Sequence, residues 1–175
     1  MRRFVVPVLA VLAAAVLGGC SGSAESTPAR GDSTSAAVTD KPAKQRTAEK
    51  IANALTAEVA TAKVTKVYTA QDDPNKLLGR PNGYQSKVAF ADSRVPESEV
   101  EGTKPDAVER GGSVEVFADA ESAKKRADYI QNIAKNMPAA GEYDYVAGPV
   151  LVRVSRVLPP DQAKEYETAR RNVTK

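Results

Sequence analysis

Apolar residues recur at helical spacing in three stretches between Thr47 and the C-terminus. After Thr47, whose hydroxyl can cap a helix, apolar side chains follow one another every three or four residues, which predicts a helix over 47–60. The second stretch opens at Asp119, another capping residue, and its apolar stripe continues until Pro138 stops it. The third opens with the turn-forming segment 158–161 and runs to near the C-terminus. The pattern therefore predicts three amphipathic helices.

Short apolar or alternating runs predict strands between these helices. The strands are expected at 64–69, 84–90, 113–117, 143–146 and 150–157. The polar stretch 93–112 is expected to be a long excursion, and 73–79, with a capping Asp, a Pro and a final Gly, predicts one helical turn within a loop. This order fits a single α+β domain over 47–175, with an antiparallel or mixed sheet and helices packed on one face.

The first 19 residues have the pattern of an export signal. Two arginines precede an apolar run over 4–17, which is shorter than the about 20 residues of a spanning helix, and the run ends in Leu17-Gly18-Gly19-Cys20. This end resembles the lipobox of bacterial lipoproteins, and the resemblance implies that Cys20 is lipidated and becomes the first residue of the mature chain. An ordinary secretory signal followed by an unrelated Cys is the alternative.

The segment 20–46 is expected to be a disordered tether. It consists largely of Ser, Thr, Ala, Gly, Pro and charged residues, so it buries too little apolar surface to offset the entropy of ordering. Attached to Cys20, such a tether would hold the domain close to a membrane.

Charge and composition exclude several classes of function. The chain carries 25 Lys and Arg against 22 Asp and Glu, and two of the arginines lie in the predicted signal, which leaves 23 against 22 in the mature chain. The balanced domain argues against binding of nucleic acid. With no His and one Cys, a Cys/His zinc site, a Ser-His-Asp triad and an intrachain disulfide cannot be built. We therefore expect no metal and no cofactor.

The loop 79–84 is the candidate ligand-binding segment. Arg80, Asn82 and Tyr84 can present a guanidinium, an amide and a ring to an anion, a sugar or a peptide. Turn chemistry alone also explains Pro81-Asn82-Gly83, so a structural role stays open.

Three other patterns suggest chemistry less strongly. Ser122 and Lys125 match an acyl-transfer pattern, but its supporting motifs are absent and a solvated helix face is the simpler interpretation. Asp73 could begin a calcium loop, but the positions that need Asp or Asn and Gly hold leucines, which favours a cap. Asp92, paired with Asp106 or Glu109, could supply two carboxylates for hydrolysis.

The lipobox, the tether and the stretches 111–117 and 150–155 together resemble small secreted lipoproteins of actinobacteria, an uncharacterised family. The resemblance implies an extracytoplasmic, membrane-anchored protein and supplies no catalytic residue. We therefore expect a cell-membrane lipoprotein, anchored through Cys20, that acts as a non-enzymatic binding or accessory module for an envelope protein or glycan. The alternative is a small carboxylate-dependent cell-envelope hydrolase or transferase.

Overall fold

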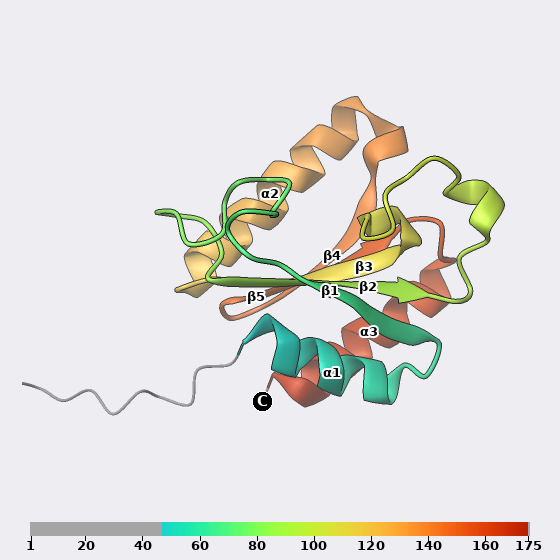
Figure 1. Cartoon of the computed structure of the whole chain (residues 1–175), viewed down its shortest axis with the longest axis horizontal. Helices are drawn as coiled ribbons and strands as arrows, with labels where there is room; N and C mark the ends of the chain where they lie inside the picture. Colours follow the sequence, from blue (N-terminus) through green and yellow to red (C-terminus); the bar gives the residue numbers. More distant parts are fainter. Residues whose placement is uncertain (1–46, 175) are drawn as a thin grey trace, which may run out of the picture. The chain divides into compact units, whose positions relative to one another are not determined.

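A computed structural model describes residues 47–174 of the chain (Figure 1). Its helices are α1 (Ala48–Glu58), α2 (Ala120–Asn136) and α3 (Pro160–Val173), with short 3-10 helices at η1 (Glu97–Glu99), η2 (Val108–Arg110) and η3 (Pro138–Ala140). Its strands are β1 (Ala62–Val67), β2 (Ser86–Asp92), β3 (Gly111–Val116), β4 (Glu142–Ala147) and β5 (Val150–Ser155). The signal segment, Cys20 and the tether lie outside the described residues. None of the helices within 47–174 is long and apolar enough to cross a membrane.

The five strands form one antiparallel sheet in the order β1-β2-β3-β5-β4. The predicted α+β domain is therefore confirmed, with the antiparallel form of the sheet. Because β3 and β4 each pair antiparallel with β5, they run parallel to each other, and α2 connects them across β5. The strands β3 and β5 thus lie in the interior of the sheet.

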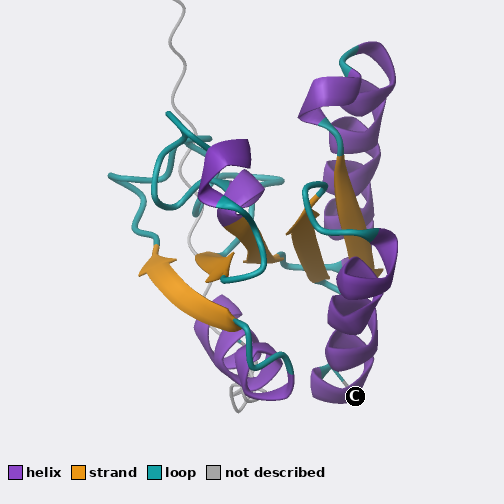
Figure 2. Ribbon diagram, turned by 90° about the vertical axis from the view of Figure 1, so that its right-hand side faces the viewer, coloured by secondary structure: helices purple, strands orange, loops and turns teal. Residues whose placement is uncertain are grey.

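The helices cover both faces of the sheet, whereas the sequence pattern predicted that they pack on one face. α1 and α3 pack against the face that carries Phe90, Val114 and Val152, whereas α2 packs against the opposite face through Leu151. Figure 1 shows α2 above the sheet and the other two helices below it, and Figure 2 gives the side view. The reason is the crossover from β3 to β4, whose helix must pack on one side of the strand that it passes.

Local sequence signals set the ends of the helices. The Thr47 hydroxyl accepts a hydrogen bond from the Lys50 amide at 3.3 Å, and the Asp119 carboxylate accepts one from the Ser122 amide at 2.7 Å. Pro138, the predicted stop, lies two residues beyond the end of α2 and begins η3. All three predicted helices are therefore confirmed, and their stated ends lie within one or two residues of the observed ones.

The strand and loop boundaries depart further from prediction. β3 begins at Gly111, two residues before the predicted start, because Gly112 lies beneath the Phe90 ring, where an added Cβ would come within 2.3 Å of Cζ. The segment 73–79 forms turns in place of the predicted helical turn. There the Asp73 carboxylate accepts hydrogen bonds from the amides of Leu77 and Leu78, at 2.8 and 3.1 Å, which fixes the loop without a helix.

Candidate functional site

Charged side chains lie on the sheet face that α2 covers. Lys87 on β2 is 4% exposed, and Glu115 on β3 is fully buried. Lys87 pairs in register with Glu115, and Arg153 on β5 pairs with Ser113, two residues before Glu115 on the same strand. The three charged side chains therefore lie close together on three adjacent strands. Groups of this kind are buried only when they are paired, because their desolvation is costly.

Glu115 is the centre of the pairing. Its carboxylate lies 3.1 Å from Nη1 of Arg153, 3.3 Å from Nε of Arg126 on α2 and 3.7 Å from Nζ of Lys87. Arg153 also makes a bidentate ion pair with Glu142 on β4, in which Nε and Nη2 donate to the two carboxylate oxygens at 2.5 and 2.8 Å. One carboxylate thus connects β2, β3, β5 and α2.

Lys87 lies between two tyrosine rings and a second carboxylate. Its Nζ is 3.6 Å from the Asp73 carboxylate and 4.8 and 5.3 Å from the ring centroids of Tyr68 and Tyr84. Burial holds the pKa of Lys87 below its ordinary value, although the charges of Glu115 and Asp73 oppose this shift. With its amide oxygen turned inward, Asn75 accepts hydrogen bonds from Lys87 Nζ and Arg126 Nη2, each at 3.1 Å.

These six charges form what we call the buried charge network. Its members are Lys87, Arg126, Arg153, Asp73, Glu115 and Glu142. Three cations face three anions, so the network is neutral.

Asp144 lies beside this network on β4. Burial raises the pKa of Asp144 to about 8, and the neighbouring charge of Glu142 adds to the shift. Gln131 on α2 donates to its carboxyl group at 2.7 Å. At neutral pH Asp144 is therefore mostly protonated and adds little charge.

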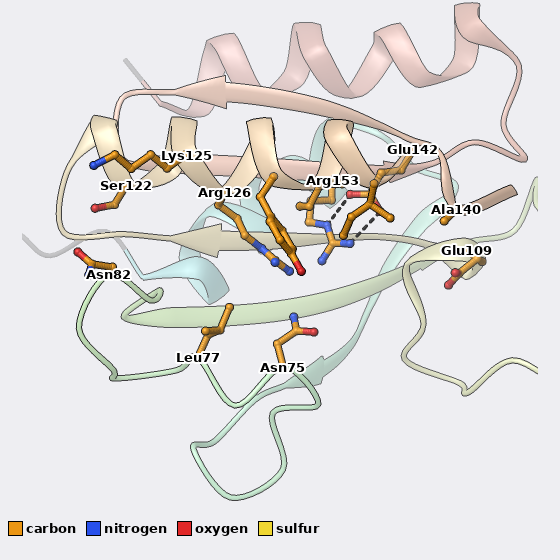
Figure 3. Close-up of a pocket in the computed structure, with 13 residues that line it drawn as sticks. Asn75, Leu77, Asn82, Glu109, Ser122, Lys125, Arg126, Ala140, Glu142 and Arg153 are labelled. Carbon is orange, nitrogen blue, oxygen red and sulfur yellow. Dashed lines mark hydrogen bonds and ion pairs between the residues drawn. The ribbon is translucent and has the colours of Figure 1, made fainter. Parts of the chain in front are cut away.

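Above the network lies a cavity of about 670 Å³, which we call the α2 cleft (Figure 3). One wall consists of α2 residues: Ser122, Lys125, Arg126, Tyr129, Ile130 and Ile133. The opposite wall comes from the loop before β2, namely Asn75, Leu77 and Asn82, and Glu109, Ala140, Glu142 and Arg153 complete the lining. Figure 3 shows the Arg126 side chain directed across the cleft toward Asn75.

The lining combines apolar surface with hydrogen-bonding groups. Tyr129 is 59% exposed and its ring lies 5.8 Å from the Arg126 guanidinium carbon, with Ile133 one turn further along α2. Asn75, Asn82 and Ser122 supply uncharged polar groups around this surface. The arrangement suits a ligand with an apolar part and polar groups.

The predicted candidate loop 79–84 contributes in part. Asn82 lines the α2 cleft, and Arg80 and Asn82 line a neighbouring hollow of about 610 Å³. Tyr84 needs a correction: it is completely buried, with its hydroxyl donating to Asp73 at 2.6 Å and its ring beside Phe117, so it is not presented to solvent.

The carboxylates considered for hydrolysis lie apart. Asp92 is buried toward α3, where Tyr166 donates to it at 2.5 Å and Arg94 pairs with it at 2.7 Å. Asp106 is held by the Tyr68 hydroxyl at 3.0 Å, and Glu109 lines the α2 cleft. Asp92 therefore serves in an ion pair on the other face of the sheet.

Ser122 and Lys125, the residues of the acyl-transfer pattern, do not form a pair of nucleophile and base. Both residues line the cleft, but Lys125 is exposed and pairs with Glu121 at 2.7 Å. The hydrogen bond to Glu121 raises the pKa of Lys125, which opposes a role as a general base. Within residues 47–174 no group of three or more His, Cys, Asp or Glu is placed to hold a metal ion.

The main components of the site were missed in the sequence. Lys87, Glu115 and Arg153 lie within three predicted strands, and none of them belongs to a motif that the sequence analysis identified. Their opposite charges on strands that pair with each other were the available signal.

Comparisons with known proteins give no guide to the site: no family model, no curated protein and no solved structure matches this chain.

Proposed function

We propose that this protein is a lipid-anchored, extracytoplasmic binding module and that the α2 cleft holds its ligand. The anchor rests on the signal-like segment 1–19 and on Cys20. The binding role rests on the cleft, because a hollow of about 670 Å³ beside an exposed Tyr129 falls in the size range of ligand sites. The ligand is an envelope glycan or a segment of an envelope protein.

The observation that carries the proposal is the prearranged floor of the cleft. Arg153 makes hydrogen bonds to both Glu115 and Glu142, and Arg126 is tied to Glu115, so these side chains are already fixed before a ligand arrives. Fixed polar groups reduce the entropy that binding costs.

A carboxylate-dependent enzyme fits the geometry less well. Glu142 and Asp144 are the acids that β4 brings together beside the cleft, and a protonated acid next to an ionised one is a familiar catalytic pattern. However, both carboxylate oxygens of Glu142, which lines the cleft, already accept hydrogen bonds from Arg153. The Asp144 carboxyl group accepts a hydrogen bond from Gln131. Neither carboxyl group is placed to transfer a proton to a bound molecule.

The proposal can be tested by site-specific photocrosslinking in the native envelope. A benzophenone amino acid is placed at Tyr129 in the cleft and, as a control, at Lys50, which is exposed on α1. We expect a defined adduct from position 129 that position 50 does not give. The adduct should disappear when Ile133→Asp places a charge in the apolar wall. The same products from both positions, or none from position 129, would refute the cleft as the binding site.

A further inference from the structure

A smaller recess opens behind the α2 cleft. It has a volume of about 150 Å³ and shares Asn75, Glu109, Glu142 and Arg153 with the lining of the cleft, so the two hollows adjoin. We call it the inner recess. Its volume is several times the about 30 Å³ that a water molecule occupies in the liquid, so it has room for more than one bound water.

The inner recess contains hydrogen-bonding capacity that the protein leaves unused. Ser113 lines it and is 1% exposed, yet its hydroxyl has no hydrogen-bond partner in the part of the chain that the structure describes. Lys87 also lines it. Its Nζ donates one hydrogen bond to Asn75, at 3.1 Å, but both carboxylates near it lie beyond hydrogen-bonding distance, at 3.6 and 3.7 Å, so two of its three N–H groups remain available. Buried polar groups are normally satisfied, which points to a guest in the recess.

The charge balance decides which kind of guest fits. The charges of Lys87 and Arg153 at the recess are already offset by Asp73, Glu115 and Glu142 in the buried charge network. Of the other two carboxylates in the lining, Asp106 pairs with Lys66 at 3.3 Å, and Glu109 is exposed, so water screens its charge. A buried anion would therefore meet no unpaired cation in the recess, and a buried cation would meet only the solvated Glu109, so either ion would be costly to desolvate. A neutral group with hydroxyls can accept from Lys87 and Ser113 and donate to a carboxylate without disturbing the balance.

We propose that the inner recess binds the uncharged, hydroxyl-bearing end of the ligand, as at the end of a sugar chain, while the rest of the ligand lies along the α2 cleft. This inference rests on the proposed function and adds the chemistry of the recognised group. It favours a glycan over a protein segment as the occupant, with the exposed Tyr129 ring available as a stacking surface for a sugar.

Three probes of the same size distinguish the possible charges. Glycerol is neutral, glycerate is its anionic counterpart and 3-amino-1,2-propanediol its cationic one. Binding of each to the full chain in detergent micelles is measured by saturation-transfer NMR, for the wild type and for Ser113→Ala. We expect glycerol to bind best and Ser113→Ala to weaken it about fivefold through loss of one hydrogen bond. Ser98→Ala, at an exposed position on η1 that lines neither hollow, is the matched control and should leave glycerol binding unchanged.

A second variant keeps the test independent of folding. Because the Ser113 hydroxyl makes no hydrogen bond in the described part of the chain, we expect Ser113→Ala to keep the wild-type circular dichroism and melting temperature. Ser113→Val fills the recess and should also lose the probe.

Three results would overturn the inference: glycerol binding by both Ser113 variants that equals that of the wild type, a preference for a charged probe, or no binding of any of the three probes to the wild type. Loss of the Tyr129 adduct in the envelope would instead count against the proposed function, so the two failures can be told apart.

Discussion

Replacing Glu115 with Gln tests the buried charge network directly. Gln has nearly the same shape as Glu but no charge, so the substitution leaves the packing of β3 unchanged. Lys87, Arg126 and Arg153 would then face only Asp73 and Glu142, and the network would carry one uncompensated positive charge. Since Glu115 is fully buried, water cannot screen that charge.

The expected loss is large compared with the stability of a domain. Removing one partner of a buried ion pair typically costs about 3–5 kcal/mol. The amide oxygen of Gln can still accept from Arg153, which lies 3.1 Å from the present carboxylate, so we expect the lower end, about 3 kcal/mol. Domains are stable by about 5–15 kcal/mol, so Glu115→Gln should still fold.

Urea unfolding followed by circular dichroism measures the effect. With a slope of about 1–3 kcal/mol per molar urea, the midpoint should fall by about 1–3 M. Asp128→Asn is the matched control: it removes an exposed ion pair with Lys124, which is worth about 0.5 kcal/mol at most.

A double variant separates charge imbalance from local damage. Lys87→Met combined with Glu115→Gln restores neutrality and keeps an unbranched side chain between the tyrosine rings. We expect it to recover more than half of the stability lost in Glu115→Gln, because the two positions interact. A loss below about 1 kcal/mol in the single variant, or simple additivity in the double variant, would refute the network as described.

Three further predictions concern other residues. The raised pKa of Asp144, about 8, means that the folded protein binds more protons there than the unfolded chain between about pH 4 and 8. The free energy of unfolding should therefore decrease as pH rises, by up to about 1.4 kcal/mol per pH unit, and urea titrations at two pH values should show a flatter slope for Asp144→Asn. Tyr84→Phe removes the hydrogen bond to Asp73 and should cost about 1–2 kcal/mol in thermal unfolding, whereas Arg80→Ala, at an exposed position, should leave the melting temperature unchanged. Cys20→Ser should move the protein out of the membrane fraction or leave the precursor uncleaved, and a mature, membrane-bound Cys20→Ser protein would contradict the anchor.

The helices were predictable because their signals are local. The caps at Thr47 and Asp119 and the break at Pro138 act within one turn of the helix ends that they define. The start of β3 was not predictable in this way. Two glycines usually indicate a loop. The reason that Gly112 belongs to the sheet lies on the two neighbouring strands, where the Phe90 ring and the Arg153 carbonyl oxygen leave no room for a Cβ.

The site was not predictable because its parts meet only after the strands pair. Alternation along one strand separates two faces but does not say whether the polar face meets water or an oppositely charged neighbour. Lys87, Glu115 and Arg153 become partners through the order β2-β3-β5, in which β5 is inserted after the crossover to β4. No spacing within a single segment carries that information.

The buried charge network also explains why the α2 cleft stays open. Buried ion pairs stabilise a fold weakly, and apolar residues of similar volume would often do better. Apolar side chains at Lys87, Glu115 and Arg153 would, however, draw α2 and the loop before β2 onto the sheet and fill the space between them. Arg126 and Asn75 instead meet across the cleft through a hydrogen bond of 3.1 Å, and Arg126 and Lys87 are both paired with Glu115. We therefore expect an apolar replacement of the whole network to raise the stability of the domain. If the α2 cleft holds a ligand, as proposed, the same replacement should also abolish ligand binding.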